Sequence, residues 1–471
     1  MNSNEPLHTG ITRFVIAGHG LEAWLTANHL LAAFGGRRIE IKVCPVPGSD
    51  DYDDFYSVWP MGMDNGLDPI KVPIKALVQE CRGSFSLGFR YGDLFRPYGT
   101  IGLDFLGTPF HHHWLRAFAK EPASGYFDWS PATIAVNHDR FAPPVSQNAI
   151  GSLQHGMAMH IDTALLTAML RERALRNGAH ESGSALSAVQ RENSGDRIKW
   201  LETRNGEKLT AELYLDCSGP QRSLVSESAA DQWRSAPGLD NYAVSIKKEP
   251  SQNAPPSFHQ VTPVANGWQL DIPGNGWCVA LTVESSTDET NGKTITPGYS
   301  EKPWVENCVA IGMASSSLLP LEAVHTRFLA TSVKRLVDHM PGVDCDPRET
   351  VEYNKLAITD LAEILDLTAA YEHFRRQGMV SAPGALHDSL KKRIDLFEQR
   401  GWVSPPDSSF FEPGDWVASF MQLGLVPARP DRLAGRIPKE TLEEYLKSLK
   451  ARIMKTAMDF PPLQQFRAPQ A

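Results

Sequence analysis

The 471-residue sequence has little of what would place it in several common classes of protein. Its six cysteines form no Cys-x-x-Cys pair, which indicates reduced thiols and argues against a cysteine-based metal site. No apolar run is long enough to span a membrane, and the N-terminus lacks the basic start and apolar stretch of a signal peptide. We therefore expect a soluble, cytoplasmic protein without a membrane partner.

An excess of positive charge is also missing. The chain has 46 Lys and Arg residues against 55 Asp and Glu residues, a formal net charge of -9. Nucleic-acid-binding proteins concentrate positive charge, so this balance argues against a nucleic-acid partner. The length and a hydrophobic content of 42% predict a large core shared by two joined lobes.

The first motif with chemical content lies near the N-terminus. The apolar residues 14–17 lead into Gly18, His19 and Gly20, and Ala23 completes the pattern Gly-x-Gly-x-x-Ala before apolar residues recur at helical spacing. This order predicts a strand, a tight turn and a helix whose N-terminus faces an anionic cofactor. Gly18 permits the turn, Gly20 permits close approach of a pyrophosphate, and Ala23 lets the helix pack on the strand. A plain strand-turn-helix connection is the alternative.

The second predicted strand lacks the acid that dinucleotide-binding folds use. Such folds end this strand with an Asp or Glu that holds the ribose hydroxyls, and Cys44 stands there instead. The acidic residues 50–54 come later in the chain and are interpreted as a solvated loop. The pattern predicts a nucleotide-binding fold with a weakened hold on the nucleotide.

Two later segments predict further backbone contacts to the same cofactor. After a hairpin within residues 188–203, an apolar strand ends at residues 216–219, where flavin-binding folds return to the dinucleotide and the Asp is expected to stabilise the turn. Residues 304–311 form another apolar strand that runs into a turn of small residues, whose N–H groups would face the middle of a long cofactor. The predicted cofactor-binding residues in these segments are Asp216, Gly219, Gly312, Met313 and Ala314.

Two other stretches bear on the site. The alternation of residues 84–91 predicts one strand with Ser86 and Arg90 on the same face. Residues 111–113 are consecutive histidines, and in an extended segment their side chains would point in alternate directions and could not converge on one ion. We expect no metal site and a role for these histidines in packing or in a substrate pocket.

Periodicity and capping residues predict the remaining elements. The predicted helices are residues 74–80, 163–177, 328–340 and 439–458, the predicted β-rich lobe is 241–282, and a polar loop is expected at 283–301.

In their order along the chain, these motifs resemble those of the flavin-dependent tryptophan halogenases. Five segments covering nearly the whole chain carry the resemblance: 18–20, 157–162, 216–219, 304–322 and 411–416. The third matches the family's Asp-Cys-Ser-Gly, and the fourth resembles its Trp-Val-x-Asn-Cys-Val-Ala-Ile-Gly signature, which ends in Pro-Leu-Glu.

The resemblance implies an α/β fold with a flavin monooxygenase-like FAD-binding domain. That domain, with its β-rich substrate lobe, is expected over residues 10–350, and a mostly helical lobe packed on it over 351–471. It also implies FAD as cofactor, a separate flavin reductase that supplies it in reduced form, and an aromatic small-molecule substrate. In the family, oxygen and the reduced flavin oxidise a halide, and a Lys and a Glu act on the hypohalous acid at the substrate.

The departures from the family pattern fall on the halogenation residues. Ser86 stands where the family has its Lys, and a hydroxyl offers neither the charge nor the amine. Glu322 matches the family's Glu, although a carboxylate that only stabilises a turn is the alternative. Val324 and His325 replace residues of the halide cradle, and Leu270 replaces the second tryptophan of the Gly-Trp-x-Trp-x-Ile-Pro motif. The predicted catalytic residues are Ser86 and Glu322, and the predicted substrate or halide pocket residues are Trp268, Val324 and His325.

The sequence therefore predicts an FAD-dependent oxidoreductase that acts on an aromatic substrate by halogenation or monooxygenation. The smaller Leu270 and the altered cradle favour oxygenation, and Ser86 predicts little halogenation of free tryptophan. The alternative is a catalytically impaired flavin-binding companion of an active halogenase.

Overall fold

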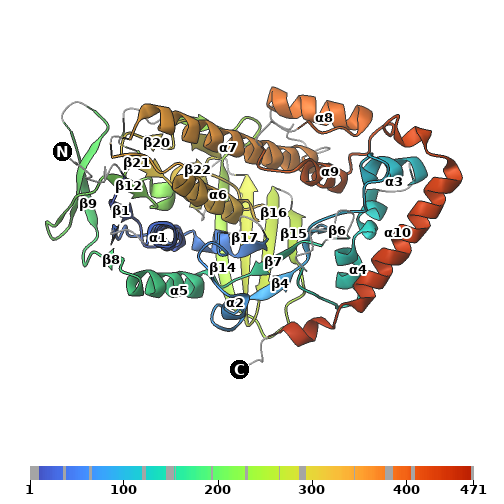
Figure 1. The fold of residues 1–471 in the computed structure, drawn as a ribbon, viewed down its shortest axis with the longest axis horizontal. Coiled ribbons are helices and arrows are strands. Elements are labelled where there is room, and N and C mark those ends of the chain that lie inside the picture. The colour runs from blue at the N-terminus through green and yellow to red at the C-terminus, as the bar shows by residue number, and fades with distance from the viewer. Residues whose placement is uncertain are drawn as a thin grey trace, which may run out of the picture.

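The structure is a computed structural model, and the residues it describes are 10–35, 39–62, 66–118, 123–144, 153, 155–192, 195–226, 228, 232–264, 266–285, 293–343, 345–376, 386–404 and 409–467. Figure 1 shows an elongated molecule with a parallel sheet near the N-terminus at one end, a second large sheet in the middle, and the long helix α10 (Lys439–Asp459) along the other end. The predicted α/β class is confirmed.

The N-terminal motif lies in a six-stranded sheet of order β20-β21-β12-β1-β2-β8. Its strands are β1 (Arg13–Ala17), β2 (Glu40–Cys44), β8 (His180–Glu181), β12 (Leu213–Asp216), β20 (Trp304–Val305) and β21 (Cys308–Ala310). Neighbouring strands are parallel except β20 and β21. Because the carboxyl ends of parallel strands meet at one edge, the three turns predicted to contact a cofactor lie together there.

A seven-stranded sheet of order β18-β14-β17-β16-β15-β5-β6 forms the middle of the molecule. Its strands are β5 (Gly88–Tyr91), β6 (Leu94–Pro97), β14 (Tyr242–Pro250), β15 (His259–Val264), β16 (Gly267–Gly274), β17 (Trp277–Ser285) and β18 (Lys293–Ile295). On β16, Trp268, Leu270 and Ile272 are buried and alternate with more exposed residues, as expected for a strand with one face on the core. This sheet is the predicted β-rich lobe, extended by two strands from earlier in the chain.

The other strands of the described residues form three small sheets, with the orders β3-β7-β4, β11-β10-β9 and β13-β19-β22. Their strands are β3 (Val58–Met61), β4 (Ser84–Ser86), β7 (Met157–His160), β9 (Leu186–Arg191), β10 (Ile198–Thr203), β11 (Lys208–Leu209), β13 (Trp233–Ser235), β19 (Gly298–Ser300) and β22 (Ser316–Ser317). The hairpin predicted within residues 188–203 is confirmed as β9 and β10.

Helices cover the sheets and form the far end of the molecule (Figure 1). In addition to α10, they are α1 (Leu21–Phe34), α2 (Ile74–Gln79), α3 (Phe110–Phe118), α4 (Pro131–Asn137), α5 (Thr163–Arg176), α6 (Val324–Asp338), α7 (Pro347–Arg375), α8 (Asp388–Arg400) and α9 (Pro413–Gln422). The predicted α5 is confirmed: Asp162 caps its N-terminus and Asn177 ends it. The domain boundary predicted at residue 351 falls inside α7.

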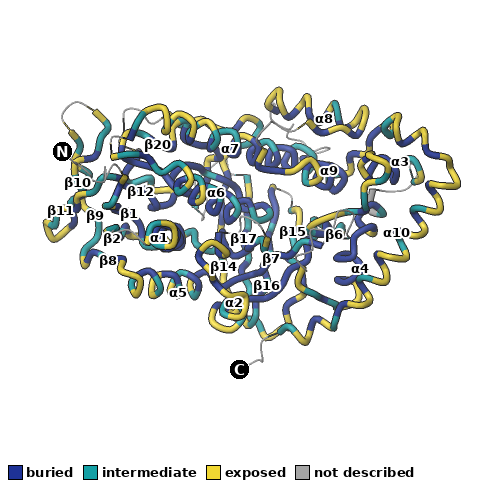
Figure 2. Tube along the Cα trace, viewed as in Figure 1, coloured by how far each residue is buried: buried dark blue, intermediate teal, exposed yellow. Residues whose placement is uncertain are grey.

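Burial follows these layers. Figure 2 shows buried residues concentrated in the central strands and α7, whereas α10 is exposed along much of its length. The apolar residues of α10 recur every three or four positions, so one face of this helix packs on the core. The buried residues on that face are Leu442, Leu446, Leu449, Ile453 and Ala457.

Two sequence predictions about strands are wrong. Residues 84–91 are two strands in different sheets, β4 and β5, because Leu87 between them bonds to the backbone of Ser257 and Tyr98. Ser86 and Arg90 therefore share no sheet face. The stretch predicted as a polar loop, 283–301, contains β18 and β19, which pair with neighbours distant in the chain.

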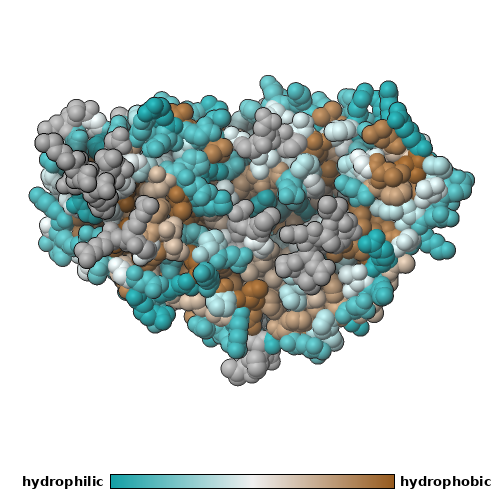
Figure 3. Space-filling model, viewed as in Figure 1, coloured by the Kyte–Doolittle hydropathy of each residue, from teal (hydrophilic) through white to brown (hydrophobic). Residues whose placement is uncertain are grey.

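On the side of the molecule drawn in Figure 3, hydrophobic residues lie in patches between hydrophilic ones. Over the ranges described above, no helix is both long enough and apolar enough to cross a membrane.

Candidate cofactor and active site

The predicted turn between β1 and α1 is confirmed. Gly18 has φ +138°, a conformation that favours glycine, and its N–H donates to the Cys44 carbonyl at 2.9 Å. A Cβ at this position would lie 2.2 Å from the carbonyl oxygen of Cys217 in the turn after β12. Ala23 is fully buried in the first turn of α1, as its predicted packing role requires. Gly18 thus brings the ends of three strands into close contact.

The other two predicted turns lie at the same edge. The Asp216 carboxylate accepts hydrogen bonds from the N–H groups of Ser218 (3.1 Å), Leu224 (2.7 Å) and Val225 (3.1 Å), so it stabilises its own turn, as expected. Gly219, with φ +63°, follows in that turn.

The third turn, Gly312–Ala314, follows β21 as a single 3₁₀ turn that begins at Gly312 with φ +60°. Met313 and Ala314 are buried there, and the Ala314 carbonyl accepts a hydrogen bond from the Arg222 side chain at 3.1 Å. All three backbone segments predicted to contact a cofactor are therefore neighbours, because β12 pairs with both β1 and β21.

A carboxylate of the chain itself lies at the N-terminus of α1. The Leu21 N–H donates to both oxygens of Asp53, at 3.1 and 3.0 Å, and the Thr167 hydroxyl donates to one of them at 3.2 Å. Burial is the main cause that raises the pKa of Asp53 well above its ordinary value. The prediction of a solvated loop at residues 50–54 is thus wrong for Asp53, which is held by contacts with residues distant in the sequence.

His19 binds the same stretch of chain. Its N–H donates to the Ser49 hydroxyl at 3.0 Å, its Nδ1 lies 3.0 Å from that hydroxyl, and its Nε2 lies 3.3 Å from the Asp50 carboxylate. A Cβ at Gly20 would lie 2.8 Å from Asp53 Oδ1 and 3.0 Å from the Ser49 carbonyl oxygen. Residues 49–53 therefore cover the face of the turn that a pyrophosphate would approach.

A second carboxylate, that of Glu22, lies at the turn after β21. The Met313 N–H donates to Glu22 Oε1 at 2.7 Å, the Tyr56 hydroxyl donates to the same oxygen, and a Cβ at Gly312 would lie 2.2 Å from it. Glu22 is 3% exposed, and this burial raises its pKa to about 7 against the opposing effect of the Met313 and Tyr56 hydrogen bonds. Glu22 was not predicted as a site residue; an acid inside a Gly-x-Gly-x-x-Ala motif is the feature that could have indicated it.

The backbone at this edge fits a dinucleotide cofactor, and the side chains do not. The N–H groups of Leu21 and Met313 point to the site, which suits a pyrophosphate. Each of them already binds a carboxylate of the chain, and an anionic cofactor would meet these like charges at close range. A pyrophosphate could use these N–H groups only if both carboxylates moved away from them.

The predicted catalytic residues lie in different parts of the fold. Ser86, at the end of β4, is fully buried, and its hydroxyl donates to the Gly88 carbonyl at 2.9 Å. Glu322 has φ +54° and forms an ion pair with Arg96 of β6, at 2.7 Å between Oε1 and Nη1. The Tyr371 hydroxyl donates to the same oxygen at 3.1 Å.

Arg96 was not identified from the sequence as a site residue. Its side chain is 8% exposed, and it also donates to the Ser419 hydroxyl at 2.8 Å and to the Asp415 carbonyl at 3.3 Å. Arg96 thus neutralises Glu322 and connects it to the helical lobe. An arginine within an aromatic-rich segment was the only local feature that could have indicated this role.

The predicted pocket residues lie on either side of the loop before Glu322. The Trp268 indole N–H donates to the Pro320 carbonyl at 3.3 Å, and Val324 is the buried first residue of α6. His325 is buried, and its ring contacts Phe55 edge-on with the ring centroids 5.0 Å apart. Burial lowers the pKa of His325 to about 4, so the ring is neutral at pH 7.

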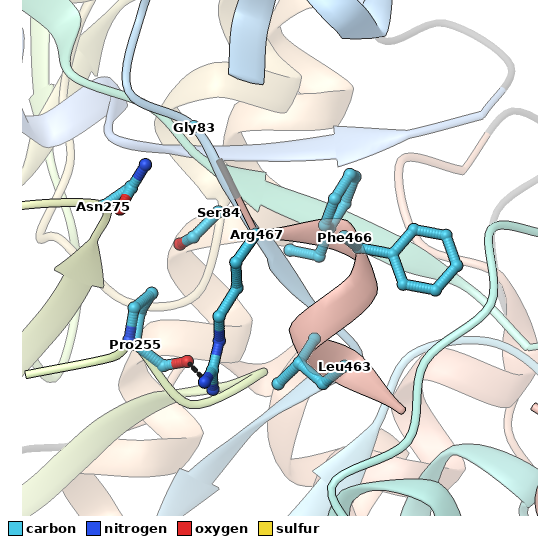
Figure 4. A pocket seen from close by; sticks show the side chains of 8 residues that line it. Gly83, Ser84, Pro255, Asn275, Leu463, Phe466 and Arg467 are labelled. Atoms are coloured by element: carbon cyan, nitrogen blue, oxygen red, sulfur yellow. Dashed lines mark hydrogen bonds between the residues drawn. The ribbon is translucent and has the colours of Figure 1, made fainter. Parts of the chain in front are cut away.

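A small hollow lies beside β4, away from the carboxyl edge of the parallel sheet. Figure 4 shows side chains from β4 and from the C-terminal residues around it, with Arg467 donating to the Pro255 carbonyl at 3.0 Å. Most of its space is open to solvent, and the enclosed part is about 10 Å³, roughly enough for one water molecule. This hollow does not supply the space for a large cofactor.

The three histidines at 111–113 lie in α3, so the prediction of an extended segment is wrong. Their partners are backbone groups: His111 lies 2.8 Å from the Gly401 carbonyl, and His113 lies 3.1 Å from the Phe105 carbonyl. Among the residues described, no three His, Cys, Asp or Glu side chains are grouped as a metal ion would require.

A parallel sheet with three glycine turns at its carboxyl edge, joined to a large β-rich lobe, defines a dinucleotide-binding type of α/β protein. Over residues 13–439 the chain matches the family model described as tryptophan halogenase, and it belongs to that family. The family consists of flavin-dependent halogenases, enzymes that use FAD for the halogenation of aromatic compounds.

Individual relatives are distant in sequence. The chain is 21% identical to the tryptophan 7-halogenase RebH of Lentzea aerocolonigenes, over 97% of this chain and 98% of that protein. The structure is similar to BrvH, a flavin-dependent halogenase from Brevundimonas sp. BAL3, with a TM-score of 0.86 at 22% identity over 97% of this chain and 98% of BrvH. Xcc4156, a flavin-dependent halogenase from Xanthomonas campestris, gives a TM-score of 0.86 at 23% identity over 98% and 100%. At these identities the structural likeness establishes the fold.

Proposed function

We propose that this chain is an FAD-dependent oxidoreductase that acts on an aromatic small molecule, takes its flavin in reduced form from a separate reductase, and does not halogenate free tryptophan. Membership in the family supports the cofactor and the class of substrate. When bound and reduced, FAD supplies the electrons that activate oxygen.

The ion pair between Arg96 and Glu322 is the observation that carries the proposal against halogenation. The Glu322 carboxylate is held by Arg96 and Tyr371, and the Oε1 that accepts both hydrogen bonds is engaged within the chain and not with a substrate. The arginine cannot replace a catalytic amine, because its guanidinium stays protonated. At the position of the family's lysine, the Ser86 hydroxyl is bound to a backbone carbonyl and offers no amine.

The remaining predicted residues have positioning roles in this proposal. Trp268 supports the loop that carries Glu322 through its hydrogen bond to Pro320. Val324 and His325 fill the place of the family's halide cradle with a branched side chain and a neutral ring. The branched side chain of Val324 and the neutral ring of His325 favour binding of an apolar aromatic compound over binding of a halide.

The test is a coupled assay with a flavin reductase, FAD, chloride or bromide, and a panel of aromatic compounds that includes tryptophan. We expect little halotryptophan, and oxygenated products or hydrogen peroxide in proportion to the oxygen consumed. A halogenated product formed at the rate of oxygen consumption would contradict the proposal. The Arg96→Met variant, which releases Glu322, serves as the comparison for any residual halogenation.

A second candidate is a flavin-binding companion that lacks catalysis. The positions of Asp53 and Glu22 support the loss of catalysis in this candidate, because a flavin that competes with them for the N–H groups is bound weakly. The same assay separates the two: a companion consumes no oxygen above the rate of the reductase with free FAD.

A further inference from the structure

We propose that two side chains of this protein occupy its own cofactor site. Asp53 and Glu22 accept hydrogen bonds from the N–H groups of Leu21 and Met313, and FAD binds only when both carboxylates have released these N–H groups. The inference rests on the proposed function only in taking FAD as the ligand. It concerns the chain's own residues and would hold whichever reaction follows.

Residues 47–56, here called the acidic segment, contact each of the three predicted cofactor-binding turns. At the first turn, Ser49 and Asp53 accept hydrogen bonds from the N–H groups of His19 and Leu21. At the second turn, the Gln221 side chain donates to the Pro47 carbonyl at 2.6 Å. At the third turn, contact is made through Glu22, to which the Tyr56 hydroxyl donates. One continuous stretch of chain thus contacts the first two turns directly and the third through Glu22.

The acidic segment is held from its outer side as well. Asp54 accepts a hydrogen bond from the Thr163 hydroxyl at 2.8 Å and lies 3.4 Å from the ammonium group of Lys248. The Ile161 N–H donates to the Ser57 carbonyl at 2.9 Å. Phe55 and Tyr56 pack edge-on against His325, with centroids 5.0 and 5.9 Å apart. These contacts hold the acidic segment in place, and with it the position of Asp53 at the N-terminus of α1.

The carboxyl group of Asp53 takes the place that a bound pyrophosphate takes at a helix N-terminus. Both of its oxygens lie within 3.1 Å of the Leu21 N–H, where the positive end of the helix dipole favours an anion. A pyrophosphate cannot use the same N–H until Asp53 has left. The carboxylate and the cofactor therefore compete for one site.

Glu22 is a different kind of obstacle, because it belongs to α1 and cannot leave with the acidic segment. Its Oε1 receives two hydrogen bonds, whereas Oε2 is buried and has no hydrogen-bond partner in the part of the chain that the structure describes. An incompletely paired buried carboxylate is costly to keep charged. Its side chain must rotate or take up a proton before an anionic cofactor can lie against Met313.

Titration of the apoprotein with FAD, followed by the quenching of flavin fluorescence, tests the proposal without any turnover. The variants are Glu22→Ala/Asp53→Ala, which frees both N–H groups, and Glu22→Gln, which removes one charge at constant size. We expect the double variant to bind FAD at least tenfold more tightly than the natural chain, and Glu22→Gln to lie between them. Glu443→Gln on α10 is the matched control, since Glu443 is 64% exposed, pairs with Lys439 and lies outside the acidic segment; its affinity should stay within twofold of the natural chain.

Equal affinity of the double variant and the natural chain would overturn the proposal, provided thermal melting shows both folded. A measurement on the natural chain covers the case in which the double variant does not fold. In that measurement, saturation with FAD should increase amide hydrogen exchange in the acidic segment. Unchanged exchange in this segment at saturating FAD would overturn the proposal. Failure of the proposed function looks different: affinity rises in the double variant, and neither protein consumes oxygen with any aromatic compound.

Discussion

Two carboxyl groups give the carboxyl edge of the parallel sheet its chemical character. Glu22 lies in the first turn of a helix, where an acid is favourable to the helix dipole. Its side chain nevertheless turns to Met313, and burial makes its charge costly. Tyr56, Asp53, Asp216 and Cys217 surround it, and the negative charge of Asp216 raises its pKa further.

The pH dependence of the unfolding free energy should therefore reflect the ionisation of Glu22. Its pKa is raised from 4.5 to about 7 on folding, so the folded chain binds the proton more tightly than the unfolded chain does. This contribution to stability is complete below pH 4.5 and is lost as the pH rises through 7. Relative to Glu22→Gln, the natural chain should lose about 2 to 3 kcal/mol of unfolding free energy between pH 5 and pH 8. Urea unfolding at both pH values measures it, and parallel pH profiles would contradict the assignment.

At the scale of elements, the turn after β21 and the helix α1 are adapted to each other. Gly312 has a positive φ and leaves the space in which the Glu22 carboxylate lies. The helix follows β1 and the turn follows β21, two strands separated in the sheet by β12, and the absence of one Cβ lets the helix and the turn touch. A glycine expected to make room for a cofactor here makes room for a side chain.

Replacement of Gly312 by Ala should destabilise the fold in two ways: through the strained backbone conformation and through contact of the new Cβ with Glu22. The left-handed conformation costs an Ala about 1 kcal/mol, and contact with Glu22 should add about 1 kcal/mol more. Gly92→Ala is the control for the backbone term alone, because Gly92 has φ +59° and a Cβ there would meet nothing within 4 Å. In the Glu22→Ala background the cost at Gly312 should fall to that of the control. A double-mutant cycle by urea unfolding measures the difference, and strict additivity would exclude the contact.

At the scale of the whole molecule, buried polar side chains join the helical lobe to the sheet and join its helices to one another. Arg96 from the seven-stranded sheet contacts Glu322, Tyr371 of α7 and Ser419 of α9. The indole of Trp416, also in α9, donates to the buried Glu363 of α7 at 3.0 Å. The helical lobe is therefore positioned on the sheet by polar contacts as well as by apolar packing.

Removal of Arg96 alone should destabilise the chain strongly. In Arg96→Met, Glu322 keeps a side chain that is only 12% exposed and loses its cation, which should cost about 3 kcal/mol. Arg96→Met/Glu322→Gln removes both charges and should recover much of that loss. Thermal or urea unfolding of the two variants tests this, and equal stability of the single and double variants would show that the pair contributes little.

Some of the fold and of the candidate site follows from the sequence alone. The turn at Gly18, the capped helix α5, the strand that ends at Asp216 and the turn at Gly312 were all predicted, because glycine conformations, caps and periodicity act over a few residues. The same local patterns placed the three cofactor turns at one edge. They also misplaced the histidines, which lie in α3, and joined β4 to β5, because local patterns do not show which distant segment a stretch of chain bonds to.

Only the tertiary structure decided which groups occupy the site. Leu21 and Asp53 are 32 residues apart, Glu22 and Met313 are 291 apart, and Arg96 and Glu322 are 226 apart. No local preference brings such residues together; the order of the strands does. Burial then turns carboxylates that look solvated in the sequence into partners of backbone N–H groups, because desolvated charges must be paired.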